Sequence, residues 1–264
     1  MERERLKAVL ETVYRRLTKR ELANPDPVIF LYPYHRPSDQ EIAGLVASSL
    51  AYGRVQQILK SVSSVLQPMG DSPRAFLERA SEAGIRRLCR GFRHRFTTEE
   101  EIFALLVGVR RVVLENGSLE RVMRDALEEE GEMVAAASRF VDALLPEGKN
   151  SSLLPRPRKG SACKRLFLFL RWMVRKDEVD PGVWRGIPAS ALLVPLDVHM
   201  HRIGRILGFT RRASGDLKTA REITRGFYEI CPEDPVKYDF ALTRFGIRED
   251  MSVREFVAML EGNG

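Results

Sequence analysis

The sequence has 264 residues and a net charge of +7, and 44% of its residues are hydrophobic. That length allows one large domain or two small lobes, and no apolar run is long enough to span a membrane, because LFLFL is bounded by Arg165 and Arg171. The N-terminal segment lacks the apolar region of a signal peptide, and the three cysteines are too widely spaced for a disulfide framework or a CxxC metal site. We therefore expect a cytoplasmic protein without a membrane anchor.

Positive charge is unevenly distributed along the chain. Basic residues cluster in segments 14–20, 86–95, 155–165 and 201–212, whereas acidic residues concentrate in segment 125–132. Clusters of arginine and lysine favour a polyanionic partner such as nucleic acid. The alternative is that these residues form solvated helix faces.

Helical periodicity of apolar residues dominates the first half of the chain. Ser38 and Glu41 have the spacing of a capping box, and the proline-rich segment 24–37 predicts a connector. The helices expected in this half cover residues 1–22, 38–53, 55–70, 72–84, 97–117, 118–131 and 132–148.

The second half continues the helical pattern after a break. Segment 146–160, PEGKNSSLLPRPRKG, predicts a loop or hairpin because it is rich in proline, glycine and lysine. The further expected helices cover residues 161–177, 197–208, 216–230, 234–247 and 252–262. The sequence thus predicts an all-α fold of about a dozen helices, arranged as two lobes with a cleft between them.

Lys164 lies in the first turn of the helix predicted in SACKRLFLFLRWMV, with Ser161 as a candidate N-cap. A cation is unfavourable at a helix N-terminus, and the apolar residues that follow predict a buried helix. Burial and the like charge of Arg165 would favour the neutral amine, which is the nucleophilic form. The alternative is a lysine that reaches along the helix end to solvent or to a phosphate.

Asp197 precedes the helix predicted in VPLDVHMHRIGRILGF and is expected to be its N-cap. This position does not exclude a chemical role for the carboxylate. Asp197 and His201 would share a helix face, but His199 would point elsewhere. A metal site would need a third ligand from a distant part of the chain, so we expect no metal here.

Two resemblances follow from these motifs. The order hairpin, lysine, buried helix and helix-capping aspartate, with LPRPRKGSACK followed by LDVH, resembles the helix-hairpin-helix DNA glycosylase superfamily, and is most similar to its archaeal 8-oxoguanine glycosylase branch. Over most of its length, including CKRLFLFLRWMVRKDEVDPGVW and DPVKYDFALTRFG, the chain is also similar to the DUF2400 family of bacterial and archaeal proteins.

The glycosylase resemblance implies a two-lobed helical fold with the active site in the cleft. One lobe would comprise residues 38–176 with Lys164, and the other residues 1–37 plus 177–264 with Asp197. The implied activity is a DNA glycosylase and AP lyase, with 8-oxoguanine as the candidate lesion. Lys164 would be the nucleophile and Asp197 the essential carboxylate. The partner would be damaged double-stranded DNA, bound by a monomer without metal or organic cofactor, in a cytoplasmic protein associated with the nucleoid.

Further site residues follow from the same resemblance. In those enzymes, backbone amides of the hairpin bind a DNA phosphate; here the hairpin has one glycine instead of a GxG turn, so basic side chains would have to compensate. No iron–sulfur cluster is expected, because only Cys231 lies in the C-terminal region. The expected DNA contacts are Arg54, Arg156, Arg158, Lys159, Gly160, Ser161, Arg165, His199 and Arg202. The candidate base-pocket residues, for which a core position is the alternative, are Tyr52, Phe167, Trp172 and Trp184.

Two other functions remain open at this stage. The first is a helical DNA- or RNA-binding protein that keeps the scaffold without the chemistry, which the degenerate hairpin favours and the lysine–aspartate pair opposes. The second is a metal-dependent hydrolase that uses Asp197 and His201.

Overall fold

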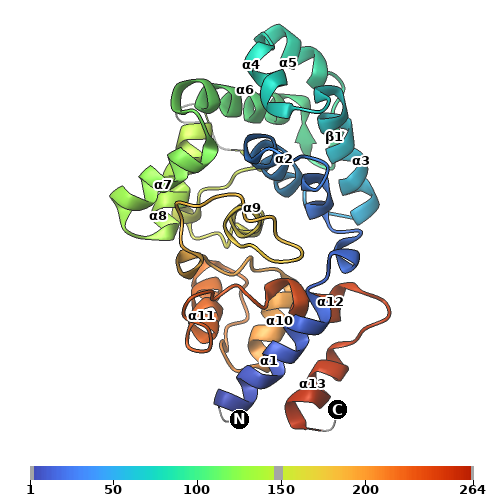
Figure 1. Cartoon of the computed structure of the whole chain (residues 1–264), viewed down its shortest axis with the longest axis vertical. Helices are drawn as coiled ribbons and strands as arrows, with labels where there is room; N and C mark the ends of the chain where they lie inside the picture. Colours follow the sequence, from blue (N-terminus) through green and yellow to red (C-terminus); the bar gives the residue numbers. More distant parts are fainter. Residues whose placement is uncertain (1–2, 146–150, 263–264) are drawn as a thin grey trace.

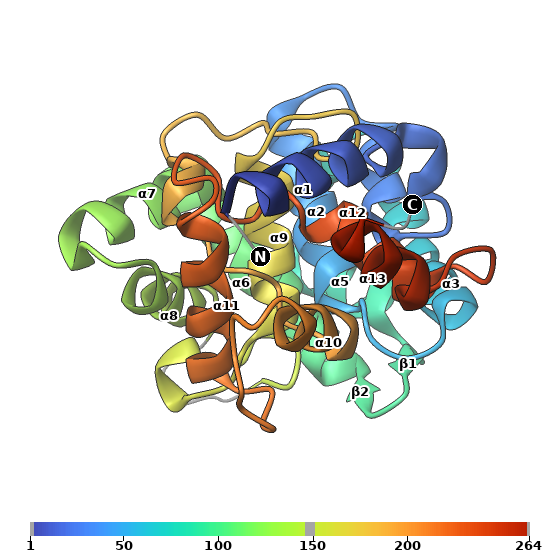
Figure 2. The same cartoon turned by 90° about the horizontal axis from the view of Figure 1, so that it is seen from below.

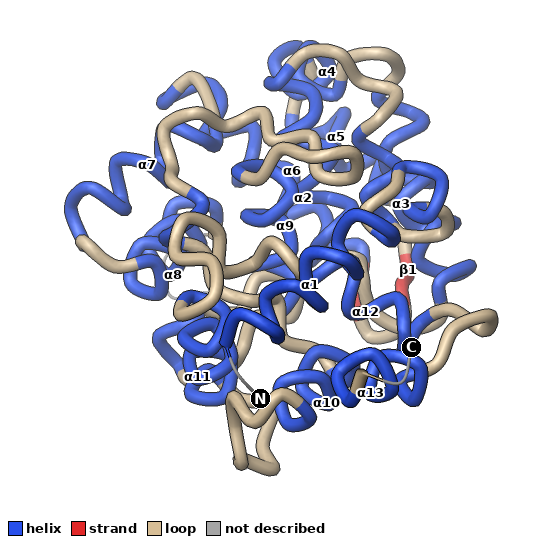
Figure 3. The backbone as a smooth tube through the Cα atoms, turned by 60° about the horizontal axis from the view of Figure 1, so that its bottom comes forward, coloured by secondary structure: helices blue, strands red, loops and turns tan. Residues whose placement is uncertain are grey.

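The structure, a computed structural model, describes residues 3–145 and 151–262, and these residues confirm the all-α class (Figures 1 and 3). The first half of the chain forms α1 (Arg3–Leu17), α2 (Pro37–Ser49), α3 (Val55–Leu66), α4 (Pro73–Arg79), α5 (Glu82–Cys89), α6 (Glu99–Asn116), α7 (Leu119–Glu130) and α8 (Met133–Leu144). The second half forms α9 (Lys164–Val174), α10 (Val198–Ile206), α11 (Leu217–Tyr228), α12 (Asp239–Ile247) and α13 (Val253–Glu261).

Short elements connect these helices. The strands β1 (Arg93–His94) and β2 (Thr97–Thr98) pair as an antiparallel hairpin between α5 and α6. The 3₁₀ turns are η1 (Arg20–Ala23), η2 (Pro27–Leu31), η3 (Gln67–Met69), η4 (Pro157–Lys159) and η5 (Ala189–Ala191). Among the described residues, no helix has the length and apolar character needed to cross a bilayer.

Helix starts that depend on a local cap agree with the sequence. Thr98 and Glu101 form a capping box at α6, and the hydroxyls of Ser72 and Ser118 accept a backbone N–H at the starts of α4 and α7. Each of these caps satisfies an N–H group that the helix itself leaves free. The predicted helix over 72–84 is wrong as one element, because α4 ends at Arg79 and Ser81 caps α5.

The capping box predicted at Ser38 is also wrong. Helix α2 begins one residue earlier, with Pro37 as its first residue and Arg36 as the N-cap. The carboxylate of Glu41 is buried and accepts hydrogen bonds from the N–H of Leu119 and from Nε1 of Trp184. The carboxylate that the local pattern assigned to a capping box at Ser38 thus makes tertiary contacts instead. Of the predicted loop 146–160, residues 146–150 lie outside the described part of the chain.

The helices gather at two ends of the long axis, with α9 between them (Figure 1). Helices α2–α8 lie at one end, and α1 and α10–α13 lie at the other, where both chain termini are found. Helix α9 packs against α2, and residues Leu166 to Met173 are all buried. The start of α9 therefore lies where the two groups of helices meet.

Three aromatic residues expected in a base pocket belong to the hydrophobic core. Phe167 and Trp172 on α9 are 1% and 0% exposed, and Trp184 is 3% exposed. The ring of Trp184 packs edge-on against Phe169, with centroids 5.2 Å apart. The base-pocket assignment of Phe167, Trp172 and Trp184 is therefore wrong, because burial of large apolar surface already accounts for these side chains.

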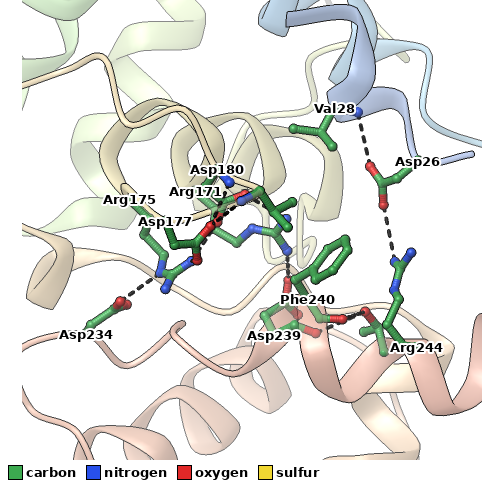
Figure 4. Close-up of polar contacts among 12 residues, drawn as sticks. Asp26, Val28, Arg171, Arg175, Asp177, Asp180, Asp234, Asp239, Phe240 and Arg244 are labelled. Atoms are coloured by element: carbon green, nitrogen blue, oxygen red, sulfur yellow. Dashed lines mark hydrogen bonds and ion pairs between the residues drawn. The ribbon is translucent and has the colours of Figure 1, made fainter. Parts of the chain in front are cut away.

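A buried network of ion pairs joins α9 to α12 and to the connector that follows α9 (Figure 4). Asp180, which is fully buried, accepts a hydrogen bond of 3.1 Å from Arg171 and one of 2.6 Å from Arg175. Arg171 also pairs with Asp239 at the start of α12, and Arg175 pairs with Asp234 at 2.7 Å. This network fixes the orientation of α9 relative to α12.

We expect Asp180→Ala to lower the free energy of unfolding by about 3–5 kcal/mol, because it leaves two buried guanidinium groups without their shared carboxylate. Urea denaturation at neutral pH measures this loss. Glu178→Ala is the matched control, since Glu178 is 55% exposed and pairs with Lys19 at the surface; it should cost less than about 1 kcal/mol. Equal small losses in the two variants would contradict the structural role of the network.

Candidate active site

The structure brings Lys164 and Asp197 together at the starts of two helices. Nζ of Lys164 lies 3.1 Å from Oδ2 of Asp197, and the two side chains are 37% and 14% exposed. Lys164 is the first residue of α9, and Asp197 immediately precedes α10. The pair is therefore fixed by two separate helices and remains accessible from solvent through the lysine.

The backbone before Lys164 has an unusual conformation. Cys163 is the N-cap of α9 and has a φ of +43°, in the left-handed region that few residues other than glycine adopt. Its carbonyl accepts the N–H groups of Leu166 and Phe167, which starts the helix. The prediction of Ser161 as N-cap is wrong. Conformational strain of this kind occurs often at functional sites.

Asp197 is the N-cap of α10, as predicted. Its Oδ1 accepts the N–H groups of His199 at 2.9 Å and of Met200 at 2.8 Å, which leaves Oδ2 facing Lys164. Burial alone would raise the pKa of Asp197, but the charge of Lys164 and the hydrogen bond from Met200 more than offset this, and the net pKa is lowered. The carboxylate is thus ionised at neutral pH.

The environment predicted for Lys164 needs correction. The side chain is partly exposed, not buried, and the guanidinium of Arg165 has other partners. The guanidinium of Arg165 donates to the carbonyls of Ser49 and Ser152 and lies 4.7 Å from the ring centroid of Tyr52. The partner of the lysine is instead a carboxylate, placed where it can accept a proton from Nζ.

The two histidines near Asp197 have different surroundings. Nε2 of His201 lies 2.9 Å from the carbonyl oxygen of Arg212, and the ring of His199 packs against Gly246 of α12. Asp197 meanwhile contacts two amides and Lys164. Among the described residues, no group of three or more His, Cys, Asp or Glu side chains has the arrangement of a metal site.

The loop before α9 does not offer its amides to a phosphate in the way the glycosylase resemblance implies. The N–H of Arg158 donates to Oγ of Ser138, that of Lys159 to the carbonyl of Arg156, and that of Gly160 to the carbonyl of Pro157. Each donor is satisfied within the chain. Gly160 and Ser161 are exposed but pair with the start of α11, through Leu217 and Asp216.

The expected DNA-contacting side chains fall into two groups. Arg156 is 8% exposed and pairs with Asp142, and Arg165 is held by carbonyl groups, so the assignment of these two to DNA contacts is wrong. His199 is half-buried. The basic residues among the expected contacts that are exposed are Arg54, Arg158, Lys159 and Arg202.

Two residues of interest were not identified from the sequence, and one of them, Asp239, interacts electrostatically with the pair. Asp239 is 4% exposed, pairs with Arg171 and has an Oδ1 atom without a hydrogen-bond partner. Burial raises its pKa to about 6, an effect that the charge of Arg171 opposes and that of Asp197 reinforces. Phe96 at the tip of the β1–β2 hairpin is 58% exposed. An arginine-flanked aromatic in FRHRFTT was the only signal for it.

The fold and this site define an all-α protein with a lysine–aspartate pair at the meeting point of two helix N-termini. The chain belongs to the family described as protein of unknown function (DUF2400), whose model matches residues 26–248. No curated protein and no solved structure matches the chain. Both Lys164 and Asp197 lie within the matched residues.

Proposed function

We propose that the protein is a DNA glycosylase with AP lyase activity, in which Lys164 is the nucleophile and Asp197 the catalytic carboxylate. The observation that carries the proposal is the contact of 3.1 Å between Nζ of Lys164 and Oδ2 of Asp197. An amine nucleophile needs a neighbouring group that takes its proton, and a sugar cation needs a fixed negative charge beside it. This pair supplies both.

The chemistry would begin with a damaged nucleotide turned out of the duplex, because its C1′ atom cannot be reached inside the stack. Lys164 gives a proton to Asp197 and attacks C1′ with its lone pair. The bond from C1′ to the base breaks, and the base leaves with the electron pair and takes up the proton held by Asp197. The carboxylate, ionised again by this transfer, stabilises the positive charge that develops on the sugar before bond formation is complete.

The second stage is strand cleavage. The adduct between Lys164 and C1′ opens the sugar ring to give an imine, which acts as an electron sink. Loss of a proton from C2′ then breaks the bond from C3′ to its phosphate oxygen by β-elimination. Water hydrolyses the imine and releases Lys164. None of these steps uses a metal or an organic cofactor.

Exposed basic residues support a polyanionic substrate. Four basic residues expected to contact DNA are exposed, namely Arg54, Arg158, Lys159 and Arg202. The separation of α2–α8 from α1 and α10–α13, with α9 between them, supports a two-lobed arrangement of the glycosylase type (Figure 1). Damaged duplex DNA, with 8-oxoguanine as the candidate lesion, is the proposed substrate, and a monomer at the nucleoid the proposed working form.

Borohydride trapping tests this function. Purified protein is incubated with labelled duplexes that contain an abasic site or one of a panel of damaged bases, including 8-oxoguanine, in the presence of borohydride. We expect a covalent adduct that survives denaturing electrophoresis, because reduction fixes the imine. Tight DNA binding without any adduct or base release would instead favour the non-catalytic binding protein. Strand cleavage that chelators abolish would favour the metal-dependent hydrolase.

A further inference from the structure

The tip of the β1–β2 hairpin carries an exposed aromatic ring. Phe96 is 58% exposed, and its ring stacks on Tyr52 with centroids 4.8 Å apart and an interplanar angle of 27°. On the same tyrosine ring lies the guanidinium of Arg165, the residue that follows Lys164. A short series of contacts therefore leads from the exposed ring to the start of α9.

The hairpin is held firmly on the turn between α2 and α3. The hydroxyl of Tyr52 contacts the carbonyl of His94 at 2.8 Å and Oγ1 of Thr97 at 2.5 Å, so it ties both strands to the turn. Fully buried His94 returns a contact of 2.9 Å to the carbonyl of Tyr52 and reaches Oγ of Ser61 at 2.8 Å. A single exposed apolar residue is ordinary at a protein surface. Here the polar contacts of Tyr52 and His94 hold the hairpin that carries Phe96, so the ring is already ordered for binding.

The charges beside Phe96 indicate what kind of partner fits it. Arg93 and Arg95 on the hairpin and Arg54 at the start of α3 are exposed. The side chain of Arg95 lies over Gly53, where an added Cβ would come within 2.7 Å of its Cδ atom. A flat apolar ring flanked by cations suits a nucleobase with its phosphates, since aromatic rings stack on bases and arginines attract the backbone.

The position of the hairpin relates it to the site. The hairpin lies at the same face of the molecule as α10, at the lower edge of Figure 2. In Figure 1 the hairpin belongs to the end formed by α2–α8, and α10 to the opposite end. A strand bound across this face would pass both the hairpin and α10, whose N-cap Asp197 contacts Lys164.

We propose that Phe96 stacks on a nucleobase of the bound DNA, namely the base left without its stacking and pairing partner when the target nucleotide leaves the duplex. Tyr52 supports the ring of Phe96 from behind, so it is a positioning residue and not part of a base pocket. Arg54, Arg93 and Arg95 hold the phosphates beside that base. This inference rests on the proposed function for the identity of the ligand, but it concerns binding and not the covalent step.

The test uses DNA on which no chemistry can occur. The probe is a duplex with a tetrahydrofuran abasic analogue and 2-aminopurine in the opposite strand, and binding is followed by anisotropy. Phe96→Ala should weaken binding about 5- to 100-fold, the range found when one base loses an aromatic partner. Phe96→Trp should restore it, because indole also stacks. In the wild type and the tryptophan variant, bound 2-aminopurine should be quenched relative to the alanine variant.

Tyr228→Ala is the matched control, since Tyr228 is 49% exposed on α11, away from the hairpin in Figure 2. It should bind the duplex like the wild type, and all three variants should keep the wild-type melting temperature. Wild-type affinity in Phe96→Ala, or equal loss in the alanine and tryptophan variants, would overturn the stacking role. If the wild type forms no borohydride adduct but Phe96→Ala still weakens DNA binding, only the catalytic proposal is refuted. If the wild type forms the adduct and Phe96→Ala binds DNA as tightly as the wild type, only the stacking inference is refuted.

Discussion

Replacing Lys164 with glutamine is expected to abolish the borohydride-trapped adduct while leaving duplex binding close to the wild-type value. The amide of glutamine cannot form an imine, so the covalent route is lost completely. Single-turnover base release should fall by at least about 10³-fold, the scale of losing a nucleophile rather than one supporting contact. Trapping yield and binding anisotropy, measured on the same abasic duplex, separate the two effects.

The variant is expected to fold normally. The pair of Lys164 and Asp197 is partly exposed on the lysine side, and such pairs contribute about 0–1 kcal/mol. Removing a cation from the first turn of α9 also relieves an unfavourable interaction with the helix dipole. The two effects oppose each other, so the melting temperature should change little.

Lys176→Gln is the matched control for this experiment. Lys176 lies just beyond the far end of α9, and its side chain is exposed. If trapping depends on the position of Lys164 and not on lysine charge in general, the Lys176 variant should form the adduct at nearly the wild-type yield. An adduct of undiminished yield in Lys164→Gln would assign the chemistry to a different amine.

Features governed by local chemistry could be predicted from the sequence. The N-caps Thr98, Ser118 and Asp197 satisfy free N–H groups within three residues of themselves, so no distant part of the chain is needed to recognise them. Ser38 followed by Glu41 has the same local pattern and failed. The carboxylate of Glu41 instead accepts hydrogen bonds from Leu119 and Trp184, which come close to it only when the chain folds.

The destinations of charged side chains could not be predicted for the same reason. Within the basic segment 155–165, Arg158 is 57% exposed and pairs with Asp142 at 2.9 Å, whereas Arg156 is buried against the same carboxylate and Arg165 spans two carbonyl groups. Nothing in the sequence distinguishes these arginines, because their partners come from α8 and from the end of α2. Positive charge along a chain thus overestimates the positive charge available on its surface.

The candidate site contains residues that local sequence identifies and a residue whose role depends on tertiary packing. Lys164 and Asp197 were identified separately, from their places at predicted helix starts, and the glycosylase resemblance paired them. Asp239 was not identified, because its relation to the pair depends on how α12 packs on α10 and on Arg171 of α9. Local sequence can indicate which residues begin helices, but the packing of those helices determines which groups share an electrostatic environment.

Substituting asparagine for Asp197 separates its two roles. Asparagine keeps an oxygen that can accept the N–H groups of His199 and Met200, and asparagine caps helices about as well as aspartate. It carries no charge, so it can neither accept the proton of Lys164 nor stabilise a positive sugar. Asp197→Asn should therefore melt near the wild-type temperature and lose about 10²-fold or more in base release, as when one preorganised electrostatic group is removed.

The alanine variant completes the test. Asp197→Ala removes the cap as well as the charge, and loss of an N-cap costs about 1 kcal/mol, so both melting temperature and base release should fall. Thermal denaturation and single-turnover base release of the two variants, measured side by side, distinguish a structural carboxylate from a catalytic one. If Asp197→Asn released damaged bases at the wild-type rate, Asp197 would only cap α10, and Lys164 would need another group to take its proton. Because the glycosylase proposal rests on the contact of 3.1 Å between Oδ2 of Asp197 and Nζ of Lys164, that result would show that the contact has no catalytic role and would overturn the proposed mechanism.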